Sequence, residues 1–158
     1  MNPLYENMTT SVFERMSLAA AKHGAVNLGQ GFPDFGWSQQ ILQAAARAVV
    51  EESGQYAPSR GLPVLRQAVA DHYNRHQGLD ISPDQVCVTS GATEAIAAAL
   101  FATIVPGDEV IVLTPAYDAY VPLIRQAGGV PREVALRPPE WRVEPDRIAE
   151  AVTGKTRA

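Results

Sequence analysis

The sequence predicts an α/β layered fold with parallel strands. From residue 86 to the end, short apolar runs alternate with helical segments, and this alternation is typical of parallel strands joined by right-handed crossovers. The length of 158 residues, with 46% hydrophobic and 19% charged residues, is that of an ordinary globular chain with a real core. In such sheets ligands bind beyond the carboxyl ends of the strands, so we look for function there.

The charge balance and the single cysteine exclude several classes of protein. There are 13 Lys and Arg residues against 17 Asp and Glu, a net charge of −4, and no basic run, which argues against nucleic-acid binding. Cys87 lies in an apolar run and is predicted to be a buried thiol in a reduced compartment. We find no secretory leader and no apolar stretch long enough for a bilayer, and we expect a soluble cytoplasmic protein.

The first helix is predicted to start at Ser11, which has capping-box spacing to Glu14, and to end before Gly24. A short strand from Ala25 then leads into an irregular loop that ends at Gly36. Gly29 and Gly31 in this loop do not form a dinucleotide motif, because Pro33 and Asp34 disrupt the required strand–turn–helix. Glycines among prolines and aromatic residues instead suggest a rigid loop whose backbone N–H groups suit a small anion.

The middle of the chain predicts two amphipathic helices, over residues 38–52 and from Pro63 to just before Gly78. His72 and His76 in the second helix have the spacing of a metal-binding pair. Because the pair lacks the glutamate of the zinc-protease motif, we favour two half-buried rings and predict no metal site.

The stretch from Val86 to Leu100 predicts a strand, a turn of small residues at Ser90-Gly91, and a helix that starts near Thr93. The first N–H groups of such a helix have no partner within it and attract a phosphate. Hydroxyl groups of Ser90 and Thr93 would add two hydrogen bonds. The alternative is an ordinary strand-to-helix turn with Thr93 near the N-cap.

Two more strands are predicted, over 109–113 and 130–136, with a helix over 117–127 between them and a last helix over 145–152. The turn at 89–91 and the segment 114–117 both follow strand ends. In a parallel sheet they would face one crevice.

Five segments together resemble the amino-terminal half of class I/II aminotransferases, the fold-type I enzymes that use pyridoxal 5′-phosphate. They are N-L-G-Q-G-F-P-D-F at 27–35, Q-Y-A-P-S-R-G-L-P-x-L-R at 55–66, V-T-S-G-A-T-E-A at 88–95, P-G-D-E-V at 106–110 and P-A-Y-D-A-Y at 115–120. The nearest branch looks like the methionine aminotransferases and kynurenine–glutamine transaminases. The resemblance implies a mostly parallel sheet with helices on both faces. Residues 1–45 would form an amino-terminal helix and substrate-side loop, and residues 46–158 a truncated first part of the cofactor-binding large domain.

The resemblance also implies a role for particular residues. Gly91, Ala92 and Thr93 would cradle the cofactor phosphate, and Tyr117 would stack on the pyridine ring. Tyr56 would reach the phosphate of the neighbouring subunit of a homodimer. The alternatives are that Tyr56 is an ordinary ring in a loop and that Tyr117 is an ordinary ring in the core.

For the substrate, the resemblance implies that the backbone of Gly31 binds the carboxylate, unless Gly31 merely shapes its loop, and that Phe13 lies near the side-chain pocket. With Phe32 and Phe35, Phe13 suggests an apolar or aromatic amino donor.

The lysine that forms the Schiff base in this family has no counterpart here, since neither Lys22 nor Lys155 stands in its motif. The chain looks like an amino-terminal portion of the enzyme, with apolar surface left open and no activity by itself. In the intact protein we expect transamination between a methionine-, glutamine- or aromatic-type amino acid and a 2-oxo acid. A pyridoxal-phosphate C–S lyase or a non-catalytic aminotransferase-like sensor domain is the alternative.

Overall fold

The computed structural model describes residues 4–6, 9–31, 33, 35–52 and 54–158. The chain divides into two compact units. The amino-terminal unit spans Thr10–Val88, and the carboxyl-terminal unit spans Thr89–Ala158 together with the residues up to Thr9. In the described part of the chain, no helix combines the length and apolar character needed to cross a membrane.

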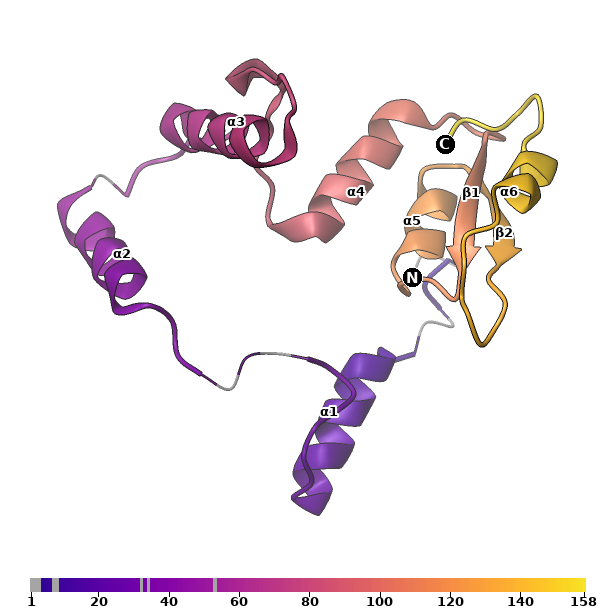
Figure 1. Ribbon diagram of the computed structural model, residues 1–158, viewed down its shortest axis with the longest axis horizontal. Coiled ribbons are helices and arrows are strands. Elements are labelled where there is room, and N and C mark those ends of the chain that lie inside the picture. Colours follow the sequence, from indigo (N-terminus) through magenta and orange to yellow (C-terminus); the bar gives the residue numbers. More distant parts are fainter. Residues whose placement is uncertain (1–3, 7–8, 32, 34, 53) are drawn as a thin grey trace. The chain divides into compact units, whose positions relative to one another are not determined.

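The amino-terminal unit is helical throughout its described elements. It contains α1 (Val12–His23), α2 (Gln39–Glu51), α3 (Pro63–Gln77) and a short 3-10 helix, η1 (Pro83–Gln85) (Figure 1). These bounds confirm the predicted helices to within a residue or two.

Local signals set the ends of α1. The Ser11 hydroxyl accepts a hydrogen bond from the N–H of Glu14 at 3.2 Å, and Gly24 closes the helix in the left-handed conformation at φ 59°. The predicted strand after Gly24 is wrong. Residues 25–28 pair with no strand in the described chain, and Asn27 instead fixes this segment by donating to the Ser17 hydroxyl at 3.0 Å.

Arg66 on α3 anchors the chain that follows η1. Its Nε lies 3.0 Å from the carbonyl oxygen of Val86, and its guanidinium also donates to the carbonyl of Pro83, at 2.6 Å from Nη2, and to the carboxylate of Asp84 at 3.0 Å. Only 13% of the Arg66 side chain is exposed. The charge is therefore held by several acceptors at once, which is what a largely buried guanidinium requires.

The segment predicted as the central strand is extended but is not a strand here. Its Val86 is buried, and the N–H of Val88 donates to the carbonyl of Arg60 at 3.1 Å. A Cβ on Gly61 would lie 2.5 Å from a methyl carbon of Val88, so glycine permits this close approach. Cys87 is exposed, and the prediction of a buried thiol is wrong because only one side of this segment is covered.

The carboxyl-terminal unit contains the parallel pair that the alternation predicted. Its elements are α4 (Gly91–Thr103), β1 (Glu109–Thr114), α5 (Tyr120–Gln126), β2 (Val130–Ala135) and α6 (Pro145–Ala151) (Figure 1). The two strands are parallel, with Glu109 opposite Val130 and Thr114 opposite Ala135. The helix predicted from residue 117 begins at Tyr120, after a turn in which the Tyr120 N–H donates to the carbonyl of Tyr117 at 3.1 Å.

A small apolar core lies between β1 and α5. Val110 and Val112 alternate along β1 and pack against Ile124 of α5, together with Ile104. A Cβ on Gly129 would lie 3.0 Å from side-chain carbons of both Ile104 and Ile124, so the chain enters β2 in close contact with this core. Much apolar surface elsewhere is open, as predicted, and Val26, Leu28 and Val49 are each more than four-fifths exposed at 83%, 91% and 84%.

The free edge of β1 is partly occupied by the last residues of the chain. The N–H of Glu109 donates to the carbonyl of Lys155, and the N–H of Arg157 donates to the carbonyl of Glu109, at 2.9 and 2.8 Å. Residue Thr156 thus forms a parallel bridge with Glu109. Within the described residues the sheet has two strands and this bridge, rather than the three strands predicted.

Candidate functional site

The start of α4 is the feature of the structure that best fits the predicted phosphate cradle. Ser90 is the N-cap, yet its hydroxyl makes no capping hydrogen bond. Gly91 has a φ of 81°, which an L-side chain rarely adopts, and a Cβ built there would meet nothing within 4 Å. Glycine is therefore required by the backbone conformation, while the space beside it is open.

The hydrogen bonds of this turn leave several donors available. The Thr89 hydroxyl donates to the carbonyl of Gly91, and the N–H of Gly91 donates to the carbonyl of Thr89, each at 2.9 Å. In the described chain, the N–H groups of Ala92 and Thr93 meet no acceptor, and both residues are exposed. Free N–H groups at the positive end of a 13-residue helix form an anion-binding surface.

Glu94 is a part of the turn that the sequence prediction did not assign. Its carboxylate accepts the N–H of Ser90, four residues earlier, a donor different from the N–H groups of Ala92 and Thr93 that a capping hydroxyl would satisfy. The negative charge suits the helix dipole. The sequence feature that could have identified Glu94 is an acidic residue in the first turn of the helix, four residues after the N-cap.

Tyr117 follows the carboxyl end of β1, where ligands bind in parallel sheets. Its ring lies edge-on to that of Tyr120, with centroids 5.6 Å apart and planes at 73°. The residue is 45% exposed, so ring surface remains accessible to a stacking ligand. The stacking role itself stays a prediction.

Tyr56, Gly31 and Phe13 all belong to the amino-terminal unit. Tyr56 is fully exposed and Phe13, on the first turn of α1, is 37% exposed. A Cβ on Gly31 would meet nothing within 4 Å, so packing does not require glycine there. The roles of these three residues, like the domain boundary after residue 45, stay predictions, and Phe32 lies outside the described residues.

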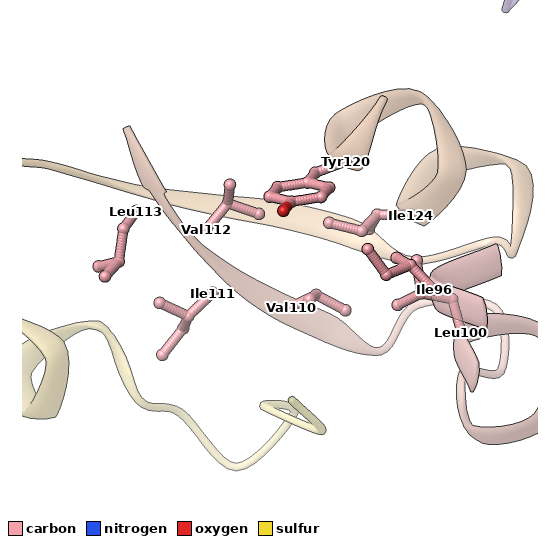
Figure 2. A pocket seen from close by; sticks show the side chains of 8 residues that line it. All are labelled: Ile96, Leu100, Val110, Ile111, Val112, Leu113, Tyr120 and Ile124. Atoms are coloured by element: carbon pink, nitrogen blue, oxygen red, sulfur yellow. The ribbon is translucent and has the colours of Figure 1, made fainter. Parts of the chain in front are cut away.

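An apolar cavity of about 380 Å³ lies over the core of the carboxyl-terminal unit. Figure 2 shows its lining side chains from α4, β1 and α5, among which the hydroxyl of Tyr120 is the one polar side-chain group. Such a lining offers little to a phosphate or a carboxylate. The cavity is an open side of the core, and the donors needed by an anionic ligand lie at the start of α4.

Comparison with known proteins identifies a family over most of the chain. Residues 23–158 match the family described as aminotransferase class I and II. The chain is 41% identical over 149 residues to the methionine aminotransferase of Escherichia coli, and 45% identical over 152 residues to a probable N-succinyldiaminopimelate aminotransferase, DapC, of Mycobacterium tuberculosis. Each alignment covers 94% of this chain but only 39% and 38% of those proteins.

Solved structures give the same result for the fold. The structure of YbdL from Escherichia coli, described as having a methionine aminotransferase function, superposes with a TM-score of 0.91 at 38% identity. It is matched over 99% of this chain and 41% of its own length. The N-succinyldiaminopimelate aminotransferase of Mycobacterium tuberculosis gives a TM-score of 0.90 at 42% identity. The chain therefore spans about two fifths of the length of the proteins it matches.

Proposed function

The chain belongs to the class I and II aminotransferases, and from this we propose that its protein transfers an amino group from an amino acid to a 2-oxo acid, with pyridoxal 5′-phosphate as cofactor. When bound, this cofactor supplies the electron sink for the reaction. The residues described here would bind it and orient it.

The start of α4 is the observation that supports the proposal most directly. The N–H groups of Ala92 and Thr93 would donate to the phosphate, and the hydroxyls of Ser90 and Thr93 would add further donors. Neither hydroxyl has a partner in the described chain, so a phosphate would displace no existing side-chain bond. Each hydrogen bond to a charged acceptor contributes about 1.5–3 kcal/mol.

Tyr117 and Tyr56 would complete the cofactor contacts. The exposed ring surface of Tyr117 suits offset stacking on the pyridine ring, worth about 1 kcal/mol beyond the area it buries. We propose that Tyr56 donates its phenol to the phosphate of a second copy in a homodimer. Its full exposure within its own unit supports a contact outside that unit.

Gly31 and Phe13 would act on the substrate, with the Gly31 N–H donating to its carboxylate. We propose an amino donor with an apolar or aromatic side chain, such as methionine, because Phe13 and Phe35 present exposed aromatic rings, at 37% and 77%. The relatives include methionine, N-succinyldiaminopimelate and aspartate aminotransferases, so the family alone does not select the amino donor.

The test is a half-reaction followed by absorbance in the full-length protein loaded with pyridoxal 5′-phosphate. We expect methionine to bleach the visible band of the bound cofactor and a 2-oxo acid to restore it. Aspartate, added in place of methionine, is the matched comparison. A tenfold or greater preference for aspartate, a roughly 1.4 kcal/mol difference, would contradict the donor assignment.

A visible band that no amino acid bleaches would contradict transamination itself. In that case the protein would be a C–S lyase or a sensor domain, both of which would share the same cofactor contacts. Analysis of the reaction products would identify the lyase.

A further inference from the structure

Two histidines on α3 lie outside the proposed cofactor site. His72 and His76 are one helical turn apart, and both are exposed, so the prediction of a half-buried ring pair is wrong. Their ring centroids are 4.7 Å apart, and the planes are inclined by 46°. Exposed rings at this spacing share one face of the helix and are open to a ligand from solvent.

The separation of the rings matches that of two imidazoles bound to one metal ion. A metal at about 2.0–2.1 Å from an imidazole nitrogen lies about 3.2 Å from the centre of that ring. Two such rings have centres about 4.5 Å apart for a right angle at the metal and about 5.2 Å apart for a tetrahedral angle. The observed 4.7 Å falls between these values.

The helix fixes the backbone positions of the two histidines before any ion binds. Gly78 ends α3 in the left-handed conformation, and the side chain of Asn74, between the two histidines, exchanges two 2.9 Å hydrogen bonds with the backbone of Ile81. The ring of Tyr73 lies edge-on to that of His72 at 5.8 Å. A rigid backbone and a neighbouring ring reduce the entropy that chelation would otherwise cost.

Contrary to the expectation from the sequence that this pair binds no metal, we propose that His72 and His76 form a two-ligand site for a divalent late first-row transition metal ion. Copper(II) is expected to bind most tightly, ahead of nickel and zinc. Among the described residues, no group of three or more His, Cys, Asp or Glu side chains is placed to hold a metal. Water would therefore fill the remaining coordination positions, and the site would bind exchangeable ions.

The test titrates copper(II) into the protein by calorimetry. His72→Ala and His76→Ala should each weaken binding by about tenfold or more, because the second ring is then no longer held at a high effective concentration. A third variant combines His76→Ala with Gln77→His, which keeps the number of histidines but moves one ring to another face of the helix. It should bind as weakly as His76→Ala.

His23→Ala is the matched control, because His23 is an exposed histidine on α1 without a ring partner at helical spacing. It should leave the affinity unchanged. Circular dichroism of each variant checks that the helices form. Equal affinity in the wild type and in the variant with the displaced histidine would overturn the proposal, as would the absence of copper binding in the wild type.

Discussion

A single carboxylate, that of Glu109, connects three segments of the carboxyl-terminal unit. It lies at the start of β1, accepts the Thr153 hydroxyl at 2.7 Å, and pairs with Nε of Arg132 on β2 at 3.2 Å. The hydrogen bond from Thr153 and the positive charge of Arg132 hold the pKa of Glu109 below its ordinary value of 4.5. Both contacts favour the charged form, so they stabilise the unit only when Glu109 is ionised.

The stability of the protein should therefore depend on pH through Glu109. Because the pKa is lowered in the folded state, the stabilisation is complete above pH 4.5 and is lost as the pH falls through the lowered value. We expect the urea midpoint of the wild type to fall more steeply than that of Glu109→Gln between about pH 5 and pH 3. Glu150→Gln, which changes an exposed carboxyl on α6, should follow the wild type. Parallel profiles for the wild type and Glu109→Gln would contradict this role.

Among the elements, α4 shows how local sequence prepares an anion site. Its N-cap hydroxyl makes no capping bond, and the carboxylate of Glu94 accepts only the N–H of Ser90 itself. This arrangement keeps the hydroxyl and the next N–H groups available. It also brings a negative charge near the position proposed for a phosphate, so the hydrogen bond and the charge of Glu94 act in opposite directions on phosphate affinity.

Two substitutions separate these effects. Glu94→Gln keeps an acceptor for the Ser90 N–H and removes the charge, whereas Glu94→Ala removes both. If the hydrogen bond from the Ser90 N–H holds the turn, affinity for pyridoxal 5′-phosphate should be highest in Glu94→Gln and lower in Glu94→Ala. Losing a hydrogen bond costs about 1 kcal/mol, or roughly fivefold in affinity when the turn must order on binding. Equal affinities of the two variants, measured by fluorescence titration, would show that only the charge matters.

The elements also show which features the sequence could predict. Helix ends at Ser11, Gly24, Pro63 and Gly78 depend on neighbouring residues and were predicted correctly. The apolar run at Val86 was mistaken for a strand, because strand formation depends on a partner that local sequence does not reveal. The contacts of Arg66 and Glu94 could not be predicted, because the hydrophobic periodicity of the sequence does not show which backbone groups a polar side chain will bind.

For the whole molecule, the parallel pair and the family were both predictable. The β1–α5–β2 order follows from the alternation of apolar strands with a helix, and the five motifs select the aminotransferase family that the comparisons then identify. The exposure of Cys87, His72 and His76 was not predictable, because burial depends on what the rest of the fold places against a segment.

The central claim is that the start of α4 anchors the phosphate of the cofactor. The most direct test compares the affinity of the full-length protein for pyridoxal 5′-phosphate with its affinity for pyridoxal, which lacks the phosphate. The two N–H donors of Ala92 and Thr93 alone, at about 1.5 kcal/mol each, predict a preference of roughly 100-fold or more for the phosphorylated form.

The same measurement on Gly91→Val should reduce this preference and leave the affinity for pyridoxal unchanged, because the new side chain occupies the open space beside the donors and strains the backbone at φ 81°. Gly154→Val is the matched control, since a Cβ there also meets nothing within 4 Å and its φ lies outside the left-handed range. Equal affinity of the wild type for the two compounds, or a preference that Gly91→Val leaves intact, would contradict the claim.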